Sequence, residues 1–380
     1  MKASYYLVIL GLLFFSCGKT TPVKLAEIRD KLTEIPVDMN QNSLLPLSEI
    51  AEEISAIELE LTDASLLSTD HIQRVFISDS YIFVANIGKI LVFNKDGKYL
   101  HSIGTSGQGP GEYNGIQNVA FDEKNKRFIL FPFLPKILFY NFDGKFLKES
   151  PQPVKAILHP AMNYVDDQLF IIVEHDPQFE NQKLLKKYSL YRLNDRFEIA
   201  DSCIILKNSI ETGGRFVFSV FTGDFIVKGN NAVYVYFPEK SLDKRVQHTF
   251  DEIVFRDTLY RYEGNQLVPD LKLKFKNDRI DWTGQKFIDL QNIYRSSRYV
   301  FAEYSNNQND NKYHFCYDTK TGKGYNMQDG YTDDINGIEQ KVKIRPLITD
   351  SEIFYYLHTH LKPDDLEEPN PTLYIIKLKK

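Results

Sequence analysis

Short runs of apolar residues alternate with polar turns along most of the chain. In the clearest part, apolar runs occupy residues 73–77, 81–85, 89–93 and 99–103, and residues 117–121, 127–131, 136–140 and 145–149 repeat the same order. Runs of this length between turn residues are typical of β-strands, and their nearly continuous apolar character indicates sheets covered on both faces. The pattern therefore predicts two consecutive four-stranded sheets.

A repeated segment relates these two sheets to each other. Residues 94–100 read Asn-Lys-Asp-Gly-Lys-Tyr-Leu and residues 141–147 read Asn-Phe-Asp-Gly-Lys-Phe-Leu, an offset of 141 − 94 = 47 residues. Each copy follows an apolar strand and places Asp-Gly where a hairpin turn is expected. A repeat of this length made of strands and tight turns indicates the blade of a β-propeller.

The rest of the chain supplies four further units. Their predicted strands are 169–173, 188–193 and 197–202 for the third, 224–227, 232–237, 258–262 and 267–273 for the fourth, 287–294, 299–304, 313–317 and 323–326 for the fifth, and 341–348, 353–357 and 372–378 for the sixth. The sixth unit lacks an outer strand, and residues 56–61 form an unassigned strand before the first. Pairing these two would close the ring and remove an open edge. We expect an all-β fold, a six-bladed β-propeller of four-stranded antiparallel blades closed by an N-terminal strand, with five blades, seven blades or a sandwich as alternatives.

The N-terminus predicts export. Lys2 precedes an apolar stretch at residues 5–15, which is too short to span a bilayer but has the length of a secretory signal. A small residue before Cys17 resembles a bacterial lipobox, so we expect a lipoprotein signal peptide at 1–17, a tether at 18–45 and the propeller at 46–380. Acyl chains on Cys17 would hold the protein on a membrane. No acidic pair follows Cys17, which favours the outer membrane with the protein facing the periplasm. An ordinary signal peptide or a short membrane anchor is the alternative.

Composition narrows the class of partner. Of 380 residues, 27 are Phe and 23 are Tyr, which suits closely packed sheets. The net charge is only −5 and the basic residues are not clustered, so nucleic acid is not an expected partner. We expect a monomeric propeller.

Several motifs together resemble one family. They are the strand at 56–61, the pair Ile-Phe-Val-Ala and Ile-Leu-Val-Phe at 82–85 and 90–93, Gly-Gln-Gly-Pro-Gly-Glu-Tyr at 107–113, Asp-Thr-Leu-Tyr-Arg at 257–261 and Asn-Pro-Thr-Leu at 370–373. In this order they resemble the NHL-like six-bladed β-propeller lipoproteins of bacterial cell envelopes. The resemblance implies the fold and an envelope location, and it implies no particular activity.

The long predicted connections fall on one face of the ring. Connections from the second to the third strand of a blade, and from an outer strand to the next inner strand, emerge on the same side. The long ones are 175–187, 238–257, 305–312 and 358–371 in the first class, and 104–116, 207–223 and 274–286 in the second. We call this side the long-connection face. Elaborated loops on a rigid scaffold are typical of a binding surface.

Candidate ligand-binding residues lie on this face. Glu112 and Tyr113 end a glycine-rich loop whose backbone could approach a ligand, although the same glycines also suit a tight turn anchored by these two side chains. Some NHL-like lyases place zinc-binding histidines at the central channel, and by comparison with them Arg215 and Arg345 are groups that would bind a carboxylate beside such histidines.

Histidines offer the weak candidates for a metal site. His71 and His159 lie at the starts of predicted inner strands, and His358 and His360 share a polar loop. Because a zinc site takes three or four protein ligands, no metal or other cofactor is expected, with zinc or calcium as the alternative.

No nucleophile or metalloprotease motif is present. We therefore hypothesise a membrane-tethered extracytoplasmic binding or scaffold propeller whose long-connection face takes an envelope protein or a glycan. The alternative is a metal-assisted lyase or hydrolase with its site in the central channel.

Overall fold

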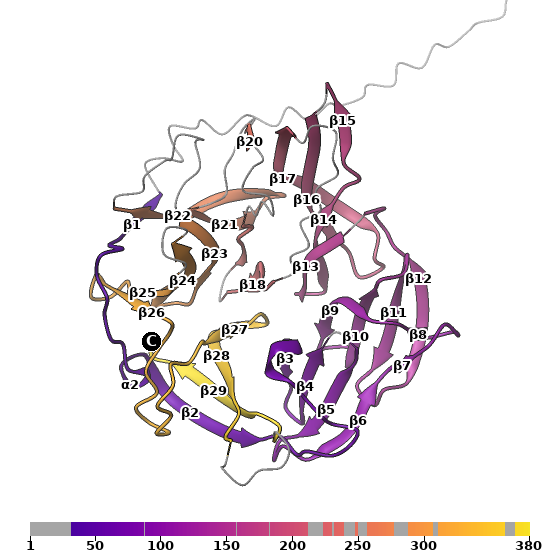
Figure 1. Cartoon of the computed structure of the whole chain (residues 1–380). Coiled ribbons are helices and arrows are strands. Elements are labelled where there is room, and N and C mark those ends of the chain that lie inside the picture. Colours follow the sequence, from indigo (N-terminus) through magenta and orange to yellow (C-terminus); the bar gives the residue numbers. More distant parts are fainter. Residues whose placement is uncertain are drawn as a thin grey trace, which may run out of the picture.

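The computed structural model describes residues 32–380 except 87, 157, 182, 212–222, 230–231, 239–247, 250–256, 277–287, 307–310 and 362–368. Six small sheets stand around a common centre and form a closed ring (Figure 1). Within each sheet the consecutive strands pair antiparallel, from an inner strand at the centre to an outer strand at the rim. This confirms the predicted six-bladed β-propeller. No helix in the described part of the chain is long and apolar enough to span a membrane.

Blades one, two and five lie where the apolar runs predict them. Blade one consists of β3 Ile72–Ile77, β4 Tyr81–Asn86, β5 Ile90–Asn94 and β6 Tyr99–Ile103; blade two of β9 Ile116–Asp122, β10 Arg127–Pro132, β11 Lys136–Asn141 and β12 Phe146–Pro151; blade five of β23 Ile288–Arg295, β24 Tyr299–Asn306, β25 Asn311–Asp318 and β26 Lys323–Gln328. At most strand ends, the observed boundary lies within three residues of the predicted one, because turn residues delimit every run.

Blade three differs most from its prediction. It consists of β13 Leu158–Val165, β14 Gln168–Glu174, β16 Lys183–Leu193 and β17 Ile199–Glu211, and the short strands β15 Gln178–Glu180 and β20 His248–Thr249 extend it. The inner strand β13 was not predicted, and residues 175–187 are partly a hairpin of β15 with β16 rather than a loop. Figure 1 shows these strands projecting beyond the ring. Blade four consists of β18 Ile226–Lys228, β19 Val233–Val235, β21 Thr258–Glu263 and β22 Gln266–Phe275.

An N-terminal strand closes the ring in blade six. This blade consists of β27 Arg345–Leu347, β28 Asp350–His358, β29 Thr372–Leu378 and the outer strand β2 Ala51–Glu58, which pairs antiparallel with β29. The predicted closure is therefore confirmed, although the strand begins five residues earlier than the apolar run suggests. It follows the short helix α2 Leu47–Ile50, and the 3₁₀ turn η1 Thr69–His71 leads into blade one.

The segment before β2 runs along the outside of three blades. β1 Thr33–Val37 pairs parallel with β22 at the outer edge of blade four, where Ile35 and Val37 are buried. The chain then bonds to blade five, Ser43 N–H donating to the Asn326 carbonyl, before it reaches blade six (Figure 1). Residues 33–37 fall in the predicted tether but form a strand, because their alternate apolar side chains pack into the sheet.

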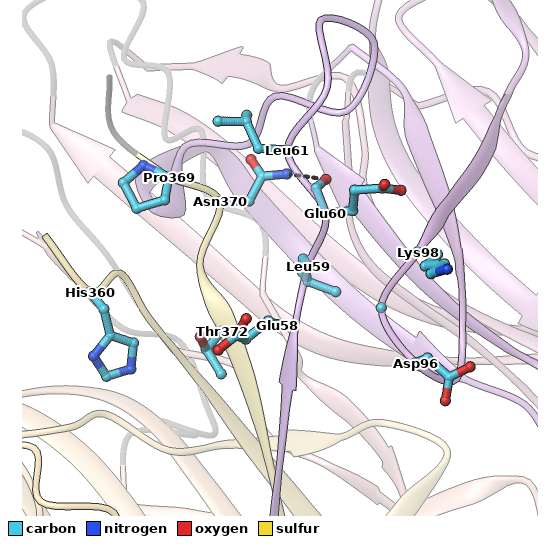
Figure 2. A pocket seen from close by; sticks show the side chains of 11 residues that line it. Glu58, Leu59, Glu60, Leu61, Asp96, Lys98, His360, Pro369, Asn370 and Thr372 are labelled. Atoms are coloured by element: carbon cyan, nitrogen blue, oxygen red, sulfur yellow. Dashed lines mark hydrogen bonds between the residues drawn. The ribbon is translucent and has the colours of Figure 1, made fainter. Parts of the chain in front are cut away.

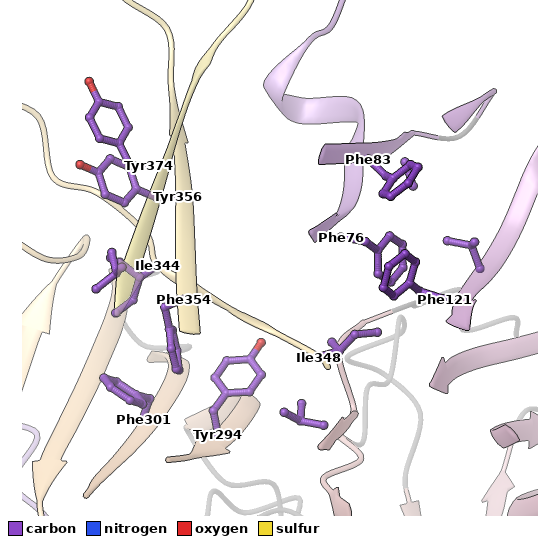
Figure 3. Close-up of a cluster of buried hydrophobic side chains, with 14 of the residues drawn as sticks. Phe76, Phe83, Phe121, Tyr294, Phe301, Ile344, Ile348, Phe354, Tyr356 and Tyr374 are labelled. Carbon is purple, nitrogen blue, oxygen red and sulfur yellow. The ribbon is translucent and has the colours of Figure 1, made fainter. Parts of the chain in front are cut away.

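The hydrophobic core fills the spaces between neighbouring blades, and one large cluster extends over several of these interfaces. This cluster contains Phe76 and Phe83 of blade one and Phe121 of blade two, and the rings of Phe76 and Phe121 stack with their centroids 5.2 Å apart (Figure 3). The same cluster reaches Phe301 and Phe354 between blades five and six, at 4.6 Å. Each blade thus uses both faces for packing, which explains the continuous apolar runs.

The repeated Asp-Gly turn has a structural purpose in blades one and two. Asn94 Oδ1 accepts hydrogen bonds from the backbone N–H of Asp96 and Lys98, which fixes the turn. Gly97 has φ +81°, and a Cβ there would lie 1.9 Å from the carbonyl oxygen of Glu58 in the preceding blade. The equivalent Gly144 also has φ +81° and lies against blade one. Glycine is required because the turn packs directly on neighbouring backbone.

Gly97→Ala is therefore expected to lower the free energy of unfolding by more than about 1 kcal/mol. The left-handed backbone alone costs about 1–3 kcal/mol for a residue other than glycine, and the clash with main-chain atoms adds to it. Gly264→Ala is the matched control: Gly264 also has a positive φ, +55°, but nothing lies within 4 Å of its Cβ position. Urea denaturation of both variants separates the two effects, and an equal loss in both would show that the contact with Glu58 is unimportant.

Candidate functional site

The described cavity at the centre of the ring opens on the long-connection face. Every inner strand begins on that face, because four antiparallel strands return the chain to the side where the blade started. The cavity has a volume of about 320 Å³. Its walls are residues at or just before the starts of four inner strands: His71, Ile72, Gln73, Arg74, Gln117, Asn118, Val119, Gly223, Asp224 and Arg345. It thus collects side chains from blades one, two, four and six.

A buried carboxylate between two guanidinium groups forms the base of this cavity. Arg74 Nε donates to Asp224 Oδ1 at 2.8 Å, and Arg345 Nη2 donates to Asp224 Oδ2 at 2.8 Å. The side chain of Asp224 is 1% exposed and that of Arg74 7%, whereas that of Arg345 keeps 33%. Two positive charges and one negative charge leave the group with a net charge of +1.

Arg74 also bonds to several blades at once. Its Nη1 donates to Asn118 Oδ1 and to the Val119 carbonyl in blade two, both at 3.1 Å, and more weakly to the Met162 carbonyl in blade three at 3.4 Å. Its Nη2 donates to the Gly223 carbonyl before blade four. Charge-assisted hydrogen bonds, which are stronger than neutral ones, therefore join the inner strand of blade one to blades two and three and to the segment before blade four.

Direct bonds between inner strands close the channel below the cavity. Asn163 Nδ2 donates to the carbonyls of Ile226 and Ile348, at 3.2 and 2.6 Å, and Lys228 N–H donates to the Ile348 carbonyl at 2.8 Å. These contacts join blades three, four and six. The cavity is therefore a blind pocket with its entrance on the long-connection face.

The charges in the pocket stabilise one another. Burial raises the pKa of Asp224, but the positive charges of Arg345 and Arg74 outweigh burial and bring the pKa below its usual value. Burial likewise opposes the charge on Arg345, and the neighbouring Tyr355 and Asp224 nevertheless raise its pKa. Asp224 and Arg345 therefore both stay ionised at neutral pH.

The two histidines predicted at the channel have different environments. His71 is exposed and lines the pocket. His159 is 2% exposed, shares a 2.9 Å hydrogen bond between its Nδ1 and Gln117 Oε1, and packs its ring against Phe131. Burial lowers the pKa of His159 to about 4, so the imidazole is neutral and supports the pocket wall from behind.

This buried imidazole predicts a loss of stability in mild acid. Because the pKa of His159 is lower in the folded protein than the ordinary 6.5, the unfolded chain binds the proton first. The stabilisation is complete above pH 6.5 and disappears as the pH falls towards 4, by about 3 kcal/mol at most. Unfolding midpoints measured between pH 7 and 4.5 should fall less in His159→Gln than in the wild type. Identical slopes would contradict the prediction; the slope that remains in the variant includes His314, whose pKa burial also lowers to about 4.

Glu112 and Tyr113 lie at the glycine-rich connection between blades one and two. Glu112 Oε2 accepts from the Gly109 N–H at 2.8 Å, and a Cβ on Gly107 would lie 2.0 Å from the same oxygen. Tyr113 is 1% exposed and donates to the Ile103 carbonyl at 2.9 Å. Both side chains fold the loop onto itself, in the short parallel pair of β7 Thr105–Ser106 with β8 Glu112–Tyr113. The structure thus gives them an anchoring role and places neither in the pocket.

The remaining candidates lie apart from the pocket or outside the described residues. The rings of His358 and His360 are 4.7 Å apart in blade six, and His360 Nε2 contacts the Tyr374 hydroxyl. Within the described ranges, no three His, Cys, Asp or Glu side chains gather closely enough to hold a metal ion. Arg215 and Cys17 lie outside the described residues.

Exposed apolar side chains distinguish the two faces of the ring. On the long-connection face the described connections expose Leu61 (38%), Leu66 (61%), Phe133 (61%), Leu134 (38%), Phe179 (46%), Ile335 (50%) and Leu361 (69%). The described turns of the opposite face expose no large hydrophobic side chain. The others lie on outer strands, such as Leu100 and Leu147, or in the N-terminal segment. Exposed apolar groups on one face are typical of an interaction surface.

The architecture defines the protein as a six-bladed β-propeller whose inner strands enclose a charged blind pocket. The model of a family described as a domain of unknown function, DUF4934, matches residues 32–379, and the chain belongs to this family. The match begins just before β1, so the family unit includes this strand, which pairs with the outer edge of blade four. No curated protein matches the chain.

One solved structure supports the fold. A crystal structure of a Bacteroides fragilis protein, named provisionally as exported, is 18% identical, with a TM-score of 0.63 over 92% of this chain and 100% of that one. At this identity the likeness shows the fold alone. The β-propeller domain of Cps50 (Swd1) from Myceliophteria thermophila is 11% identical, with a TM-score of 0.41 over 83% of this chain and 99% of its own, too low to carry an argument.

The sequence identified Arg345 as a candidate ligand-binding residue, but not Arg74 and Asp224, with which it forms the buried group. Arg74 and Asp224 lie in or beside short inner strands, where charged residues carry no pattern that separates a buried ion pair from a solvated charge. The available signal was position: Arg74, Asp224 and Arg345 all occur within three residues of an inner-strand start. Four antiparallel strands per blade bring those starts together around the pocket.

Proposed function

We propose that this protein is a membrane-tethered extracytoplasmic binding propeller whose long-connection face docks a partner protein of the cell envelope. The observation that supports the proposal is the one-sided distribution of exposed apolar side chains, with Phe133, Leu66 and Leu361 more than 60% exposed on that face. Burying such side chains against a partner is favourable by about 25 cal/mol per Å² of apolar surface. Leucine and isoleucine predominate, which favours a protein over a glycan, since sugars stack chiefly on aromatic rings.

The proposed location depends on the N-terminal sequence and on the name of the B. fragilis relative in fold. The apolar stretch at 5–15 followed by Cys17 has the order of a lipoprotein signal, and that relative is named as exported. We infer lipid anchoring through Cys17 at the outer membrane, facing the periplasm. Cys17→Ala should move the protein from the membrane to the soluble envelope fraction and remove metabolic labelling with a fatty acid. Unchanged fractionation and labelling would contradict the anchor.

The docking face is tested by cross-linking in intact cells. A Phe133→Ser/Leu134→Ser double variant changes the tip of the β10–β11 hairpin, where both side chains are exposed. The control is Leu100→Ser/Leu147→Ser, because these residues are similarly exposed, at 46% and 48%, but lie on the outer strands β6 and β12. We expect the hairpin variant to lose a cross-linked protein that the wild type and the control retain.

Two results would overturn the proposal. One is a set of cross-linked proteins that is the same in the hairpin variant, the control and the wild type. The other is retention of the protein on envelope material after its proteins are digested, with release when polysaccharide is removed. The second result would replace the partner protein by a glycan.

A further inference from the structure

One guanidinium group in the central pocket is only partly used. Arg345 Nη2 donates to the Gln73 carbonyl at 2.7 Å and to Asp224 Oδ2 at 2.8 Å. Its Nε–H and its two Nη1–H groups have no hydrogen-bond partner among the described residues. Arg74, by contrast, uses all three of its nitrogens on protein acceptors. Among the described residues, Arg345 therefore keeps hydrogen-bond donors that no acceptor uses, and its side chain keeps 33% exposure.

The electrostatics of the pocket select the charge of a ligand. Asp224 neutralises one of the two arginines, so a single positive charge remains at the base of a cavity closed below. In such a confined site an unpaired charge is costly, and one negative charge on a ligand would balance it. A doubly charged anion would leave an excess negative charge close to the buried Asp224 carboxylate.

The pocket wall supplies the remaining polar contacts. Gln117 Oε1 is engaged by His159 Nδ1 at 2.9 Å, so its amide N–H groups remain as donors at the wall. Asn118 Oδ1 accepts from Arg74 and from the Val119 N–H, and its Nδ2 donates to the His159 carbonyl. Gln73 donates to the Ile116 carbonyl and keeps its amide oxygen. Donors from Arg345 and Gln117, with one acceptor from Gln73, match an acceptor-rich group that carries a neighbouring hydroxyl or amide.

We propose that the pocket between blades one, two, four and six binds a carboxylate carried by a small monoanionic ligand, with Arg345 and Gln117 as its donors. The proposal goes beyond the docking of a partner protein and stands on different residues. The volume of about 320 Å³ suits a small organic acid or the end of a peptide, and both sources offer the same carboxylate. Arg345 would hold the charged group while Gln73 contacts the neighbouring polar group.

The experiment follows the side-chain Nε–H signals of arginine in the full mature protein by NMR. Lactate and propionate are titrated as monocarboxylates, propionamide as the uncharged analogue and sulfate as the doubly charged anion. Arg345→Lys identifies the signal of Arg345. We expect lactate to shift that signal in a saturable way while propionamide leaves it unchanged, and we expect at least about tenfold weaker binding of sulfate than of lactate.

A second variant tests the proposal without substituting Arg345, in case the loss of that side chain impairs folding. Gln117→Glu preserves the acceptor for His159 but replaces the amide donor by a negative charge, so lactate binding measured calorimetrically should be lost. Arg261→Gln is the control, since Arg261 lies on β21, is not among the residues that line the pocket, and pairs with the exposed Glu263. This control should bind lactate as the wild type does.

The outcomes separate the sources of the carboxylate. A tripeptide with a free C-terminus is compared with its C-terminal amide: binding of the free peptide but not of lactate assigns the pocket to a peptide terminus. Four results overturn the proposal. They are no response of Arg345 to either carboxylate source, an equal response to propionamide, unchanged lactate binding in Gln117→Glu, and tighter binding of sulfate than of lactate.

Discussion

Asp224→Asn is expected to lower the free energy of unfolding by about 3–5 kcal/mol, the range found when one partner of a buried ion pair is removed. The side chain of Asp224 is 1% exposed and accepts charge-assisted hydrogen bonds from Arg74 and Arg345. Asparagine has the same shape but leaves two guanidinium groups without a counter-charge. The side-chain NH2 of asparagine would also be a donor directed at a guanidinium group, which is itself a donor. Chemical denaturation of the two proteins at pH 7 measures the difference.

An exposed ion pair provides the control for this substitution. Arg261 Nη2 lies 2.9 Å from Glu263 Oε2, but both side chains are well exposed, at 41% and 61%. Pairs of this kind contribute between about 0 and 1 kcal/mol. Glu263→Gln should therefore change stability little. A loss in Asp224→Asn no larger than in this control would show that the buried network contributes nothing specific to the ring.

The carboxylate of Asp224 also makes the stability of the protein sensitive to strong acid. Its pKa lies below the usual 3.8, because Arg345 and Arg74 outweigh the effect of burial. The stabilisation is therefore complete above about pH 3.8, where the unfolded carboxylate is also ionised, and it disappears as the pH falls through the lower pKa of the folded state. This window lies below that of His159, so the two groups can be told apart by the pH at which stability is lost.

The blades that the sequence predicts best are those whose strands are apolar throughout. In blades one and two every strand ends at a turn that a hairpin requires, so pattern and turn chemistry agree. Blade three shows where this reasoning fails. Its inner strand β13 contains His159, Pro160 and Asn163, which interrupt the apolar run.

These polar residues of β13 serve the channel rather than the blade interfaces. The pairing of β13 with β14 shifts between Leu158 and Ala161, so Pro160 lies at an irregularity where no ladder hydrogen bond is lost. Asn163 is fully buried, and it bonds to two other blades. Such long-range hydrogen bonds follow no sequence periodicity, and they explain why the strand and the pocket network both escaped prediction.

The strand β1 escaped prediction for a different reason. Residues 33–37 include Pro36, and only Ile35 and Val37 are buried, so the segment is too short and too polar to be recognised as a strand. It forms because the outer edge of β22 offers a partner 238 positions away in the chain, Thr33 pairing with Leu271. Nothing in a local window reveals such a partner.

The side-chain amide of Asn370 supports the closure of the ring. Asn370 Nδ2 donates to the carbonyls of Glu60 and Ser65, both at 2.8 Å, and its Oδ1 accepts from the Leu67 N–H at 2.8 Å. Figure 2 shows this side chain directed from the segment that leads into β29 towards Glu60, which follows β2. The bonds hold residues 60–67, which lead from the closing strand β2 into blade one. Asn370 belongs to one of the motifs that support the family resemblance.

Asn370→Ala is expected to cost about 1–3 kcal/mol for each buried group that it leaves without a partner. The Ser65 carbonyl and the Leu67 N–H are such groups, since Ser65 is fully buried and Leu67 is 4% exposed. The Glu60 carbonyl keeps a bond from the Ser65 hydroxyl. Asn370→Asp should be at least as damaging, because its carboxylate would face two carbonyl oxygens.

Hydrogen exchange would then show whether the seam opens on its own. We expect the amides of residues 60–67 and of β2 to exchange faster in Asn370→Ala, while those of blade three, on another part of the ring, change only with global stability. Asn114→Ala is the control, since Asn114 is exposed and accepts a single 3.3 Å bond from Ser106. Faster exchange spread evenly over all six blades would mean that the closure is not a separate unit. Exchange confined to the seam would mean that the propeller opens where its first and last strands meet.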